Sequence, residues 1–394
     1  MLTQEKKQEV LELCARLVQA ESYSGNEKAV GGILANYFSA HGFDEVTVDG
    51  FGDVIGCVRG ARPGPRVLFD GHMDTVPVTD PEKWAHPPFS ASIHDNRMYG
   101  RGTSDMKGAL GAMACAAAGF TRDTGRDFAG EIYVAGVVHE ECFEGVAARS
   151  ISALVKPDYV VIGEASELNL KIGQRGRAEI VVETFGKAAH SANPEKGVNA
   201  VYQMTKVIEA IRNLPPTEHP VLGKGILELT DIKSSPYPGA SVVPDYCRAT
   251  YDRRLLVGET KESVLQPLRE LLDRLQKENP ELRVQVSYAV GEETCYTGEK
   301  ISGERFFPGW LFDREEPFVQ NVYCELTKHG YSPKITQYNF CTNGSHYAGE
   351  AGITTIGLGP SRENLAHTRD EYVEVEQLFG AADCYEHVMK ALLV

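Results

Sequence analysis

Basic residues are sparse in this 394-residue chain, and they form no run. Lys and Arg number 40 against 55 Asp and Glu, which gives a formal net charge of −15 at pH 7. Proteins that bind nucleic acids or anionic membranes usually carry a basic patch on the binding surface. We therefore expect neither kind of partner, although a local basic site for a small anion stays open.

The sequence also lacks long apolar segments and closely paired cysteines. Its longest apolar runs, such as residues 132–138, have the length of a strand, and residues 1–17 are charged and amphipathic where a signal peptide would be apolar. The nine cysteines are scattered and odd in number, which argues against a disulfide framework or a zinc ribbon. We therefore expect no membrane span, no export signal and a reducing, cytoplasmic location.

The length of the chain predicts two domains, since single hydrophobic cores stop growing at about 250–300 residues. Strand-like runs occur at residues 54–58, 67–69, 132–138, 159–162 and 354–357, and helical spacing occurs at 10–18, 30–38, 107–120, 146–155, 319–329 and 375–393. This alternation predicts an α/β domain with a mixed, largely parallel sheet and helices on both faces.

Between residues 175 and 290 the pattern changes. Strands are predicted at 177–185, 226–232, 246–254 and 282–288, and helices at 198–214 and 262–277. The resulting order, β-α-β-β-α-β, is that of a ferredoxin-like domain. We therefore expect residues 175–290 to form an inserted domain, and residues 1–174 and 291–394 together to form the other.

Metal-ligand side chains follow the predicted strands of the first domain. The strand ends lead to His72 and Asp74, Glu140 and Glu141, Glu164, and His367, and a glycine-rich turn places Asp105 where a helix begins. Each has an ordinary explanation alone, as a surface turn, a solvated corner or a helix N-cap. Because ligands of open α/β sheets bind outside the carboxyl ends of the strands, their joint occurrence favours a metal site. These ligands exceed what one catalytic zinc needs, so a paired site with a bridging carboxylate fits better.

At these motifs the chain resembles a known family. The segments that carry the resemblance are FDGHMDTVPV, YGRGTSDMKGALGAM, VVHEECFEG, VVIGEAS, GKAAHSANPEKGVNAV and GLGPSRENLAHTRDEYV. They are similar to those of the aminoacylase, acetylornithine deacetylase and succinyl-diaminopimelate desuccinylase family of di-zinc metallopeptidases and deacylases. The similarity runs from about residue 10 to the end, and it is strongest to a YgeY-type subgroup of selenium-metabolism-linked hydrolases.

The resemblance implies two Zn²⁺ ions per subunit, with Co²⁺ or Mn²⁺ as substitutes. It implies that His72 and Glu164 hold one ion, and that Glu141 and His367 hold the second. Asp105 is implied to bridge the two ions. In this reading residues 1–174 and 291–394 form the zinc-binding catalytic domain, and residues 175–290 form a lid and dimerisation domain.

The resemblance also implies roles in catalysis and substrate binding. Glu140 matches the general base, and Asp74 matches the carboxylate that orients the first metal-ligating histidine. His190 matches a histidine that reaches the active site of the partner subunit and stabilises the oxyanion; without the resemblance it would equally be a surface-loop residue. Arg254 is the candidate for gripping a substrate carboxylate, because its fork binds carboxylates bidentately, and its alternative is an arginine in a surface strand. Asn343 is the second candidate for substrate binding.

These expectations describe a metal-dependent amidohydrolase. It would cleave the amide bond of an N-acyl amino acid or a dipeptide with zinc-activated water, and it would act as a homodimer. A non-catalytic metal-binding or sensing protein that has kept the fold is the alternative. Loss of the base is the usual route to such a protein, and Glu140 is present. A thiol redox protein is disfavoured because the sequence contains no Cys-x-x-Cys.

Overall fold

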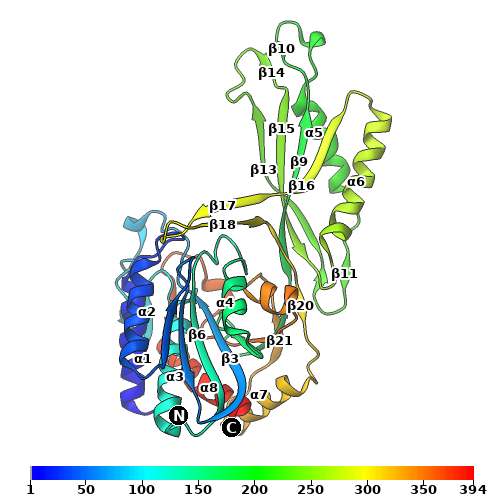
Figure 1. The fold of residues 1–394 in the computed structure, drawn as a ribbon. Coiled ribbons are helices and arrows are strands. Elements are labelled where there is room, and N and C mark those ends of the chain that lie inside the picture. The colour runs from blue at the N-terminus through cyan, green and yellow to red at the C-terminus, as the bar shows by residue number, and fades with distance from the viewer. Residues whose placement is uncertain (1) are drawn as a thin grey trace. The chain divides into compact units, whose positions relative to one another are not determined.

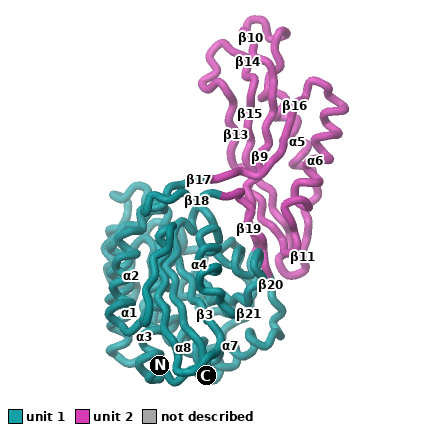
Figure 2. Tube along the Cα trace, viewed as in Figure 1, with its two compact units in different colours: residues 1–174, 292–302, 311–394 teal, residues 175–291, 303–310 magenta. Residues whose placement is uncertain are grey.

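The computed structural model describes residues 2–394, which divide into two compact units (Figure 2). Unit 1 contains the described residues up to Gln174 together with Glu292–Ser302 and Leu311–Val394. Unit 2 contains Arg175–Gly291 and Gly303–Trp310. No disulfide joins cysteines anywhere in residues 2–394. Over the same residues, none of the helices combines the length and the apolar character needed to cross a bilayer.

A mixed sheet forms the centre of unit 1 (Figure 1). Its strands, in spatial order, are β1 (Glu45–Val48), β2 (Val54–Arg59), β6 (Ala129–Val137), β3 (Arg62–His72), β7 (Tyr159–Ile162), β22 (Thr354–Gly357), β8 (Leu170–Gln174) and β20 (Trp310–Leu311), with β21 (Ile335–Tyr338) paired to β8. The four adjacent strands β6, β3, β7 and β22 are parallel, and β21 is parallel to β8. Strand β1 is antiparallel to β2, β2 to β6, and β8 to β22. The predicted mixed α/β fold is confirmed.

Six helices cover this sheet: α1 (Gln4–Gln19), α2 (Lys28–Ala40), α3 (Lys107–Thr124), α4 (Ala148–Val155), α7 (Pro317–Lys328) and α8 (Val375–Leu393). In Figure 1, α3 and α8 pass behind the sheet and α4 lies in front of it. Helix α3 is buried along most of its length, and its small residues let α1 approach closely. A Cβ atom at Gly111 would lie 2.7 Å from the sulfur of Cys14, so the contact requires glycine there.

Unit 2 is an antiparallel sheet covered on one face by two helices. Its elements are β9 (Gly176–Phe185), α5 (Ala200–Arg212), β13 (Ile226–Ser235), β15 (Tyr246–Leu255), α6 (Lys261–Glu278), β16 (Arg283–Tyr288) and β19 (Phe306–Phe307). The strand order is β13-β15-β9-β16, with β19 also on β9. Buried apolar residues of β9 and β15 alternate with mostly half-buried ones and pack against α5 and α6 in one core. A capping box between Thr260 and Ser263 begins α6.

Short elements complete the two units. One small sheet consists of β4 (Ser92–His94), β5 (Arg97–Tyr99) and β23 (Tyr372–Glu374). Three further pairs of strands are β10 (Ala189–His190) with β14 (Val242–Val243), β11 (Glu218–His219) with β12 (Gly223–Lys224), and β17 (Val290–Thr294) with β18 (Lys300–Glu304). The short helical turns are Pro81–Lys83, Pro194–Lys196, Ser345–Glu350 and Glu363–Leu365.

The chain enters unit 2 twice, which differs from the single insertion expected at residues 175–290. After the β17–β18 hairpin, Gly303–Trp310 returns to unit 2. Phe306 pairs with Ala178 on β9 and joins the unit's hydrophobic core. Burying the Phe306 ring stabilises this return, because apolar area removed from water contributes about 25 cal/mol per Å².

Candidate metal centre and active site

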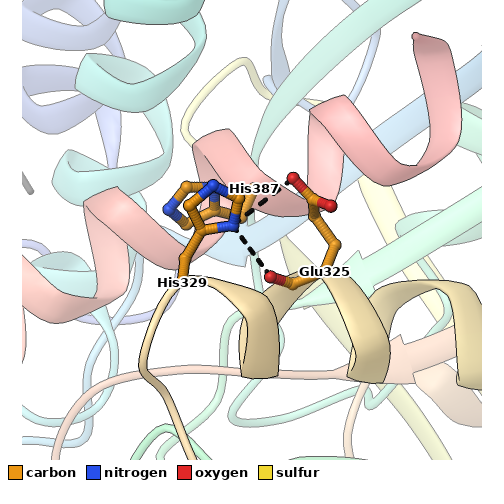
Figure 3. Close-up of side chains that lie close together, drawn as sticks. All are labelled: Glu325, His329 and His387. Atoms are coloured by element: carbon orange, nitrogen blue, oxygen red, sulfur yellow. Dashed lines mark hydrogen bonds and ion pairs between the residues drawn. The ribbon is translucent and has the colours of Figure 1, made fainter.

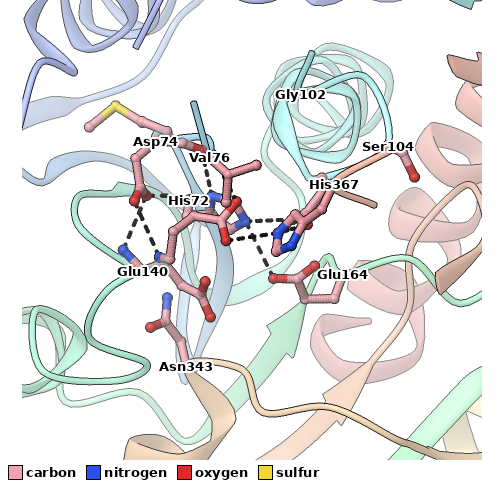
Figure 4. A network of polar contacts seen from close by, with 12 residues as sticks. His72, Asp74, Val76, Gly102, Ser104, Glu140, Glu164, Asn343 and His367 are labelled. Carbon is pink, nitrogen blue, oxygen red and sulfur yellow. Dashed lines mark hydrogen bonds and ion pairs between the residues drawn. The ribbon is translucent and has the colours of Figure 1, made fainter. Parts of the chain in front are cut away.

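The predicted metal ligands gather at the carboxyl ends of the parallel strands of unit 1 (Figure 4). His72 is the last residue of β3, Glu141 lies in the turn after β6, and Glu164 follows β7 by two positions. Asp105 precedes α3 by two residues, and His367 lies in the loop after β22. Parallel strands end at one edge of the sheet, which is why residues distant in sequence meet here.

The first group of ligand atoms comes from His72, Asp105 and Glu164. The Nε2 atom of His72 lies 2.9 Å from Oδ1 of Asp105 and 3.5 Å from Oε1 of Glu164. Its Nδ1 atom donates a hydrogen bond to the main-chain oxygen of Asp74 (2.8 Å). That bond fixes the ring and turns Nε2 toward the two carboxylates, the orientation that a metal-ligating histidine needs.

The second group comes from Asp105, Glu141 and His367. The Nε2 atom of His367 lies 3.2 Å from Oδ2 of Asp105 and 3.0 Å from Oε2 of Glu141. The two oxygens of Asp105 therefore face different histidines. Within each group the ligand atoms lie within 4.8 Å of one another. This is the arrangement expected of a carboxylate that bridges two cations.

The charges of the two groups fit divalent cations. Burial, and then the charge of Asp105, raise the pKa values of Glu164 and Glu141. Hydrogen bonds to Asp105 and Glu141 raise the pKa of His367 to about 10. In the metal-free protein, protonated His72 and His367 therefore balance the negative charge of the carboxylates, a charge that metal ions would balance in their place. With both histidines neutral, the site offers two imidazole nitrogens and three carboxylates, a donor set suited to zinc and similar ions.

Glu140 lies apart from both groups and is almost fully buried, with 6% of its surface exposed. Among the described residues 2–394, its Oε1 atom has no hydrogen-bond partner. Burial, together with the charges of Glu164 and Glu141, raises its pKa well above the usual range. A buried carboxylate with a free oxygen and a raised pKa has the properties of a general base.

Asp74 contacts this site differently from the sequence-based expectation. Its carboxylate lies 3.5 Å from Nδ1 of His72, farther than its main-chain oxygen. The carboxylate instead accepts main-chain hydrogen bonds from Glu140 (3.1 Å, to Oδ1) and Glu141 (3.2 Å, to Oδ2). Asp74 thereby joins the end of β3 to the turn after β6, and the part its carboxylate plays in orienting His72 stays a prediction.

Asn343 is buried, and both ends of its side chain have partners inside the protein. Its Nδ2 atom donates to Asp70 (3.0 Å), and its Oδ1 atom accepts from the main chain of Gly145 (2.8 Å). These contacts anchor the loop around Gly145, so the observed role is structural. A substrate contact through the remaining Nδ2 hydrogen stays a prediction.

The helical turn Ser345–Glu350 follows Asn343 and is held by Glu350. The Glu350 carboxylate accepts hydrogen bonds from Arg149 (2.9 and 2.7 Å) and lies 2.8 Å from Nδ1 of His346. Burial raises the pKa of Glu350, but the bonds to His346 and Arg149 outweigh it and lower that pKa to about 2. The ionised carboxylate thus ties α4 to this turn.

His190 and Arg254 belong to unit 2, whereas the five candidate ligands belong to unit 1. His190 is exposed on β10, and its Nδ1 atom accepts a hydrogen bond from the main chain of Ala192 (3.0 Å). Arg254 lies on β15 with its Nε atom 2.8 Å from Oδ1 of Asp252. Their roles in the reaction stay predictions.

Glu371 is a site residue that the sequence reasoning missed. It is fully buried, and its Oε1 atom accepts main-chain hydrogen bonds from Gly102 (3.0 Å), Ser104 (2.8 Å) and Asp105 (3.1 Å). Its Oε2 atom pairs with Arg101 (2.6 Å). Glu371 therefore fixes the turn that presents Asp105. Its place in the TRDEYV segment was the available signal, although nothing there shows which main-chain groups it binds.

A second cluster of metal-ligand residue types lies between α7 and α8 (Figure 3). It consists of Glu325, His329 and His387. The Glu325 carboxylate pairs with Lys390 (3.1 Å), and Nδ1 of His329 donates to the main-chain oxygen of Glu325 (3.0 Å). The two rings stack with centroids 3.8 Å apart. The cluster joins the two helices and is a poor cation site.

Comparison with known proteins agrees with this geometry. Residues 68–391 match the sequence pattern of Peptidase family M20/M25/M40. The protein YgeY of Escherichia coli K12 is 32% identical over 377 residues, covering 94% of this chain and 91% of YgeY. A succinyl-diaminopimelate desuccinylase of Hydrogenovibrio crunogenus is 27% identical, covering 98% of this chain and 99% of that enzyme.

Solved structures share the fold. Aminopeptidase PepT from Bacillus cereus superposes with a TM-score of 0.75 at 21% identity, covering 98% of each chain. The Bacillus subtilis YXEP protein, described as a dinuclear metal-binding peptidase, superposes with a TM-score of 0.71 at 13% identity, covering 99% of each chain. The matched pattern spans most of the chain and includes all five candidate ligands. The chain therefore belongs to Peptidase family M20/M25/M40, and it is a metal-dependent hydrolase of amide bonds.

Proposed function

We propose that the protein hydrolyses the amide bond of an N-acyl amino acid or a dipeptide with two zinc ions. The observation that carries this proposal is the position of Asp105, whose two oxygens face two separate groups of ligands. Relatives with desuccinylase and dipeptidase names support the two substrate classes. Co²⁺ or Mn²⁺ would serve as substitutes, because they accept the same nitrogen and oxygen ligands.

In this proposal His72, Glu164 and Asp105 hold one ion, and Glu141, His367 and the same Asp105 hold the other. Each ion then has three protein ligands, the number typical of catalytic zinc, which leaves room for water and substrate. Zinc bound there supplies positive charge that polarises the amide carbonyl and lowers the pKa of water toward neutrality.

Glu140 is the proposed general base. Its partner-free Oε1 atom is available to take a proton from the attacking water, and its burial keeps bulk water from competing. The same carboxyl then returns the proton to the leaving nitrogen. Asp74 assists by holding the main chain of Glu140 at 3.1 Å, so that the carboxylate keeps its direction through both transfers.

His190 and Arg254 are the proposed contributions of unit 2. Because Nδ1 of His190 accepts the main-chain N–H of Ala192, the proton of the neutral ring is on Nε2, which can donate to an oxyanion. Arg254 would bind the carboxylate that both substrate classes carry. We propose a homodimer in which His190 serves the active site of the partner subunit, since a two-fold contact is the commonest assembly.

A substrate panel tests the proposal. Protein stripped with a chelator and reloaded with zinc is assayed against N-acetyl, N-succinyl and N-carbamoyl amino acids and dipeptides. We expect about two zinc equivalents per chain and hydrolysis of at least one class only in the reloaded protein. Metal binding without hydrolysis of any class would favour the non-catalytic alternative, and failure to bind metal at neutral pH would refute both.

A further inference from the structure

The turn that carries Glu140 and Glu141 is held by an unusual set of acceptors. Four consecutive main-chain N–H groups donate to buried carboxylates rather than to main-chain oxygens. The bonds run from Val138 to Asp53 (2.8 Å), from His139 to Glu27 (3.2 Å), from Glu140 to Oδ1 of Asp74 (3.1 Å) and from Glu141 to Oδ2 of Asp74 (3.2 Å). The three carboxylates come from three places in unit 1, namely the start of α2, the residue before β2 and the loop after β3.

Two of these carboxylates, Glu27 and Asp53, are costly to bury. Both are fully buried. One oxygen of each, Oε2 of Glu27 and Oδ2 of Asp53, has no hydrogen-bond partner. Burial, and then the charge of Asp74, raise the pKa of Glu27 to about 7. An unsatisfied buried polar atom costs about 1–3 kcal/mol, a cost that the hydrogen bonds from main-chain N–H groups to the other oxygen of each carboxylate offset.

The backbone of the turn explains why such acceptors are needed. His139 has a φ of 54°, in the left-handed region that non-glycine residues seldom adopt. Strand β6 and its pairing end at Val137, and the reversal at His139 turns the chain away from the sheet. It also separates the two glutamate side chains: Glu141 belongs to the second ligand group, whereas Glu140 belongs to neither group. Strain of this kind persists only where surrounding contacts hold it.

We propose that Glu27 and Asp53 are positioning residues, whose carboxylates fix the turn so that Glu141 meets a metal ion while Glu140 meets the attacking water. Glu27 is well placed for this, because its Oε1 atom also accepts the main-chain N–H of Gly25 (2.9 Å) and so ties the turn to the loop before α2. This inference rests on the proposed function.

The turn that carries Asp105 shows the same construction. There the buried Glu371 accepts three main-chain N–H groups, those of Gly102, Ser104 and Asp105. In both turns, buried carboxylates therefore accept the main-chain hydrogen bonds that carbonyl oxygens accept within a sheet or helix. Two independent occurrences at one site favour a shared purpose, namely main-chain positions fixed closely enough for two cations.

Paired substitutions separate the acceptor from the charge. Glu27→Gln and Asp53→Asn keep an acceptor oxygen of the same shape, whereas Glu27→Met and Asp53→Leu keep the shape and remove the acceptor. Glu27→Asp keeps the charge but withdraws the oxygen by about one C–C bond, roughly 1.5 Å. Asp383→Asn is the matched control, because Asp383 is buried on α8 and accepts from the side chain of Tyr331 (2.7 Å).

Zinc affinity is measured by competition with a chromophoric chelator, together with melting temperature and, on the substrate that the wild type cleaves, kcat and KM. We expect the Met, Leu and Glu27→Asp variants to bind zinc about 10- to 100-fold more weakly and to lose kcat by a similar factor, with KM nearly unchanged. The Gln and Asn variants should stay within about threefold of the wild type, since their amide oxygens still accept the N–H groups. The Asp383→Asn control should change the melting temperature only.

Three results would overturn the proposal. Wild-type zinc affinity in folded Glu27→Met would show that the carboxylate only supports the fold. Equal losses in Glu27→Gln and Glu27→Met would show that charge matters and the acceptor does not. If the Met and Leu variants do not fold, wild-type behaviour of Glu27→Asp would refute positioning. A wild type that binds zinc and hydrolyses no amide would refute the proposed function instead, and the zinc affinities would still test the positioning role.

Discussion

Replacing Glu140 with Gln separates catalysis from metal binding and from stability. The amide has the shape of the carboxyl group but cannot take a proton from water, so the general-base contribution of about 10² to 10⁴ in kcat should be lost. This factor corresponds to about 3–5 kcal/mol in the activation barrier. Because Glu140 is in neither ligand group, zinc stoichiometry should stay at two per chain. Steady-state kinetics and metal analysis of the same preparation measure both quantities.

The structure also fixes the sign of the stability change. In the metal-free protein the Glu140 carboxyl is buried, has an unpartnered oxygen and is opposed by the charges of Glu164 and Glu141. A neutral amide relieves about 1 kcal/mol of this cost, so metal-free Glu140→Gln should melt a few degrees above the metal-free wild type. Loss of zinc from the variant would make Glu140 a ligand, and an unchanged kcat would remove it from the mechanism.

Three further predictions concern other parts of the molecule. Asp105→Ala should release more zinc during dialysis than His367→Ala, because a bridging ligand serves both ions; equal losses would argue against bridging. Inactive homodimers of His190→Ala and Glu140→Gln, mixed under conditions that exchange subunits, should recover up to about one quarter of wild-type activity, since half the dimers are mixed and each has one competent site. No recovery despite exchange would place His190 in its own chain. Glu350→Gln should be less stable than the wild type at pH 7, by at most about 3 kcal/mol, since the folded pKa of about 2 lies below the usual value for a glutamate. That difference is fully present above about pH 4.5 and should shrink as the pH falls toward 2, which melting curves across this range would show; a constant difference would contradict the assigned pKa.

Regular elements with a clear apolar period were predictable from the sequence. The helix expected at residues 262–277 is α6, Lys261–Glu278, and the strand expected at 177–185 is β9, Gly176–Phe185. Strand β8 was missed because its buried residues include polar ones. The buried Lys171 in this strand pairs with Glu363 at 2.8 Å and donates to the main-chain oxygen of Gln337 at 3.2 Å, and both partners come from a distant part of the chain. No local pattern contains that information.

The candidate ligands were also predictable from the apolar runs of the sequence, whereas the residues that hold the ligand-bearing turns in place were not. His72 and Glu164 stand at strand ends, and strand ends can be located from the apolar runs before them. Glu27, Asp53 and Glu371 act on main-chain N–H groups, which every residue except proline carries. Because these N–H groups are the same in every such residue, no sequence pattern shows which of them a carboxylate will bind. Only the folded backbone shows which carboxylates support the site.

The interrupted layout of unit 1 has a consequence for synthesis on the ribosome. Strand β7 pairs in parallel with β22, and all of unit 2 is translated between them. The first core to have all its strands and helices outside the ribosome is that of unit 2, because its last member is Phe306, while the sheet of unit 1 still lacks β22 and α8. Until β22 has left the ribosome, β7 keeps an unpaired edge beside an uncovered apolar face, the kind of surface that promotes aggregation. Chains truncated before β22 should therefore depend on chaperones to stay in solution, more than the length of the missing segment alone would suggest.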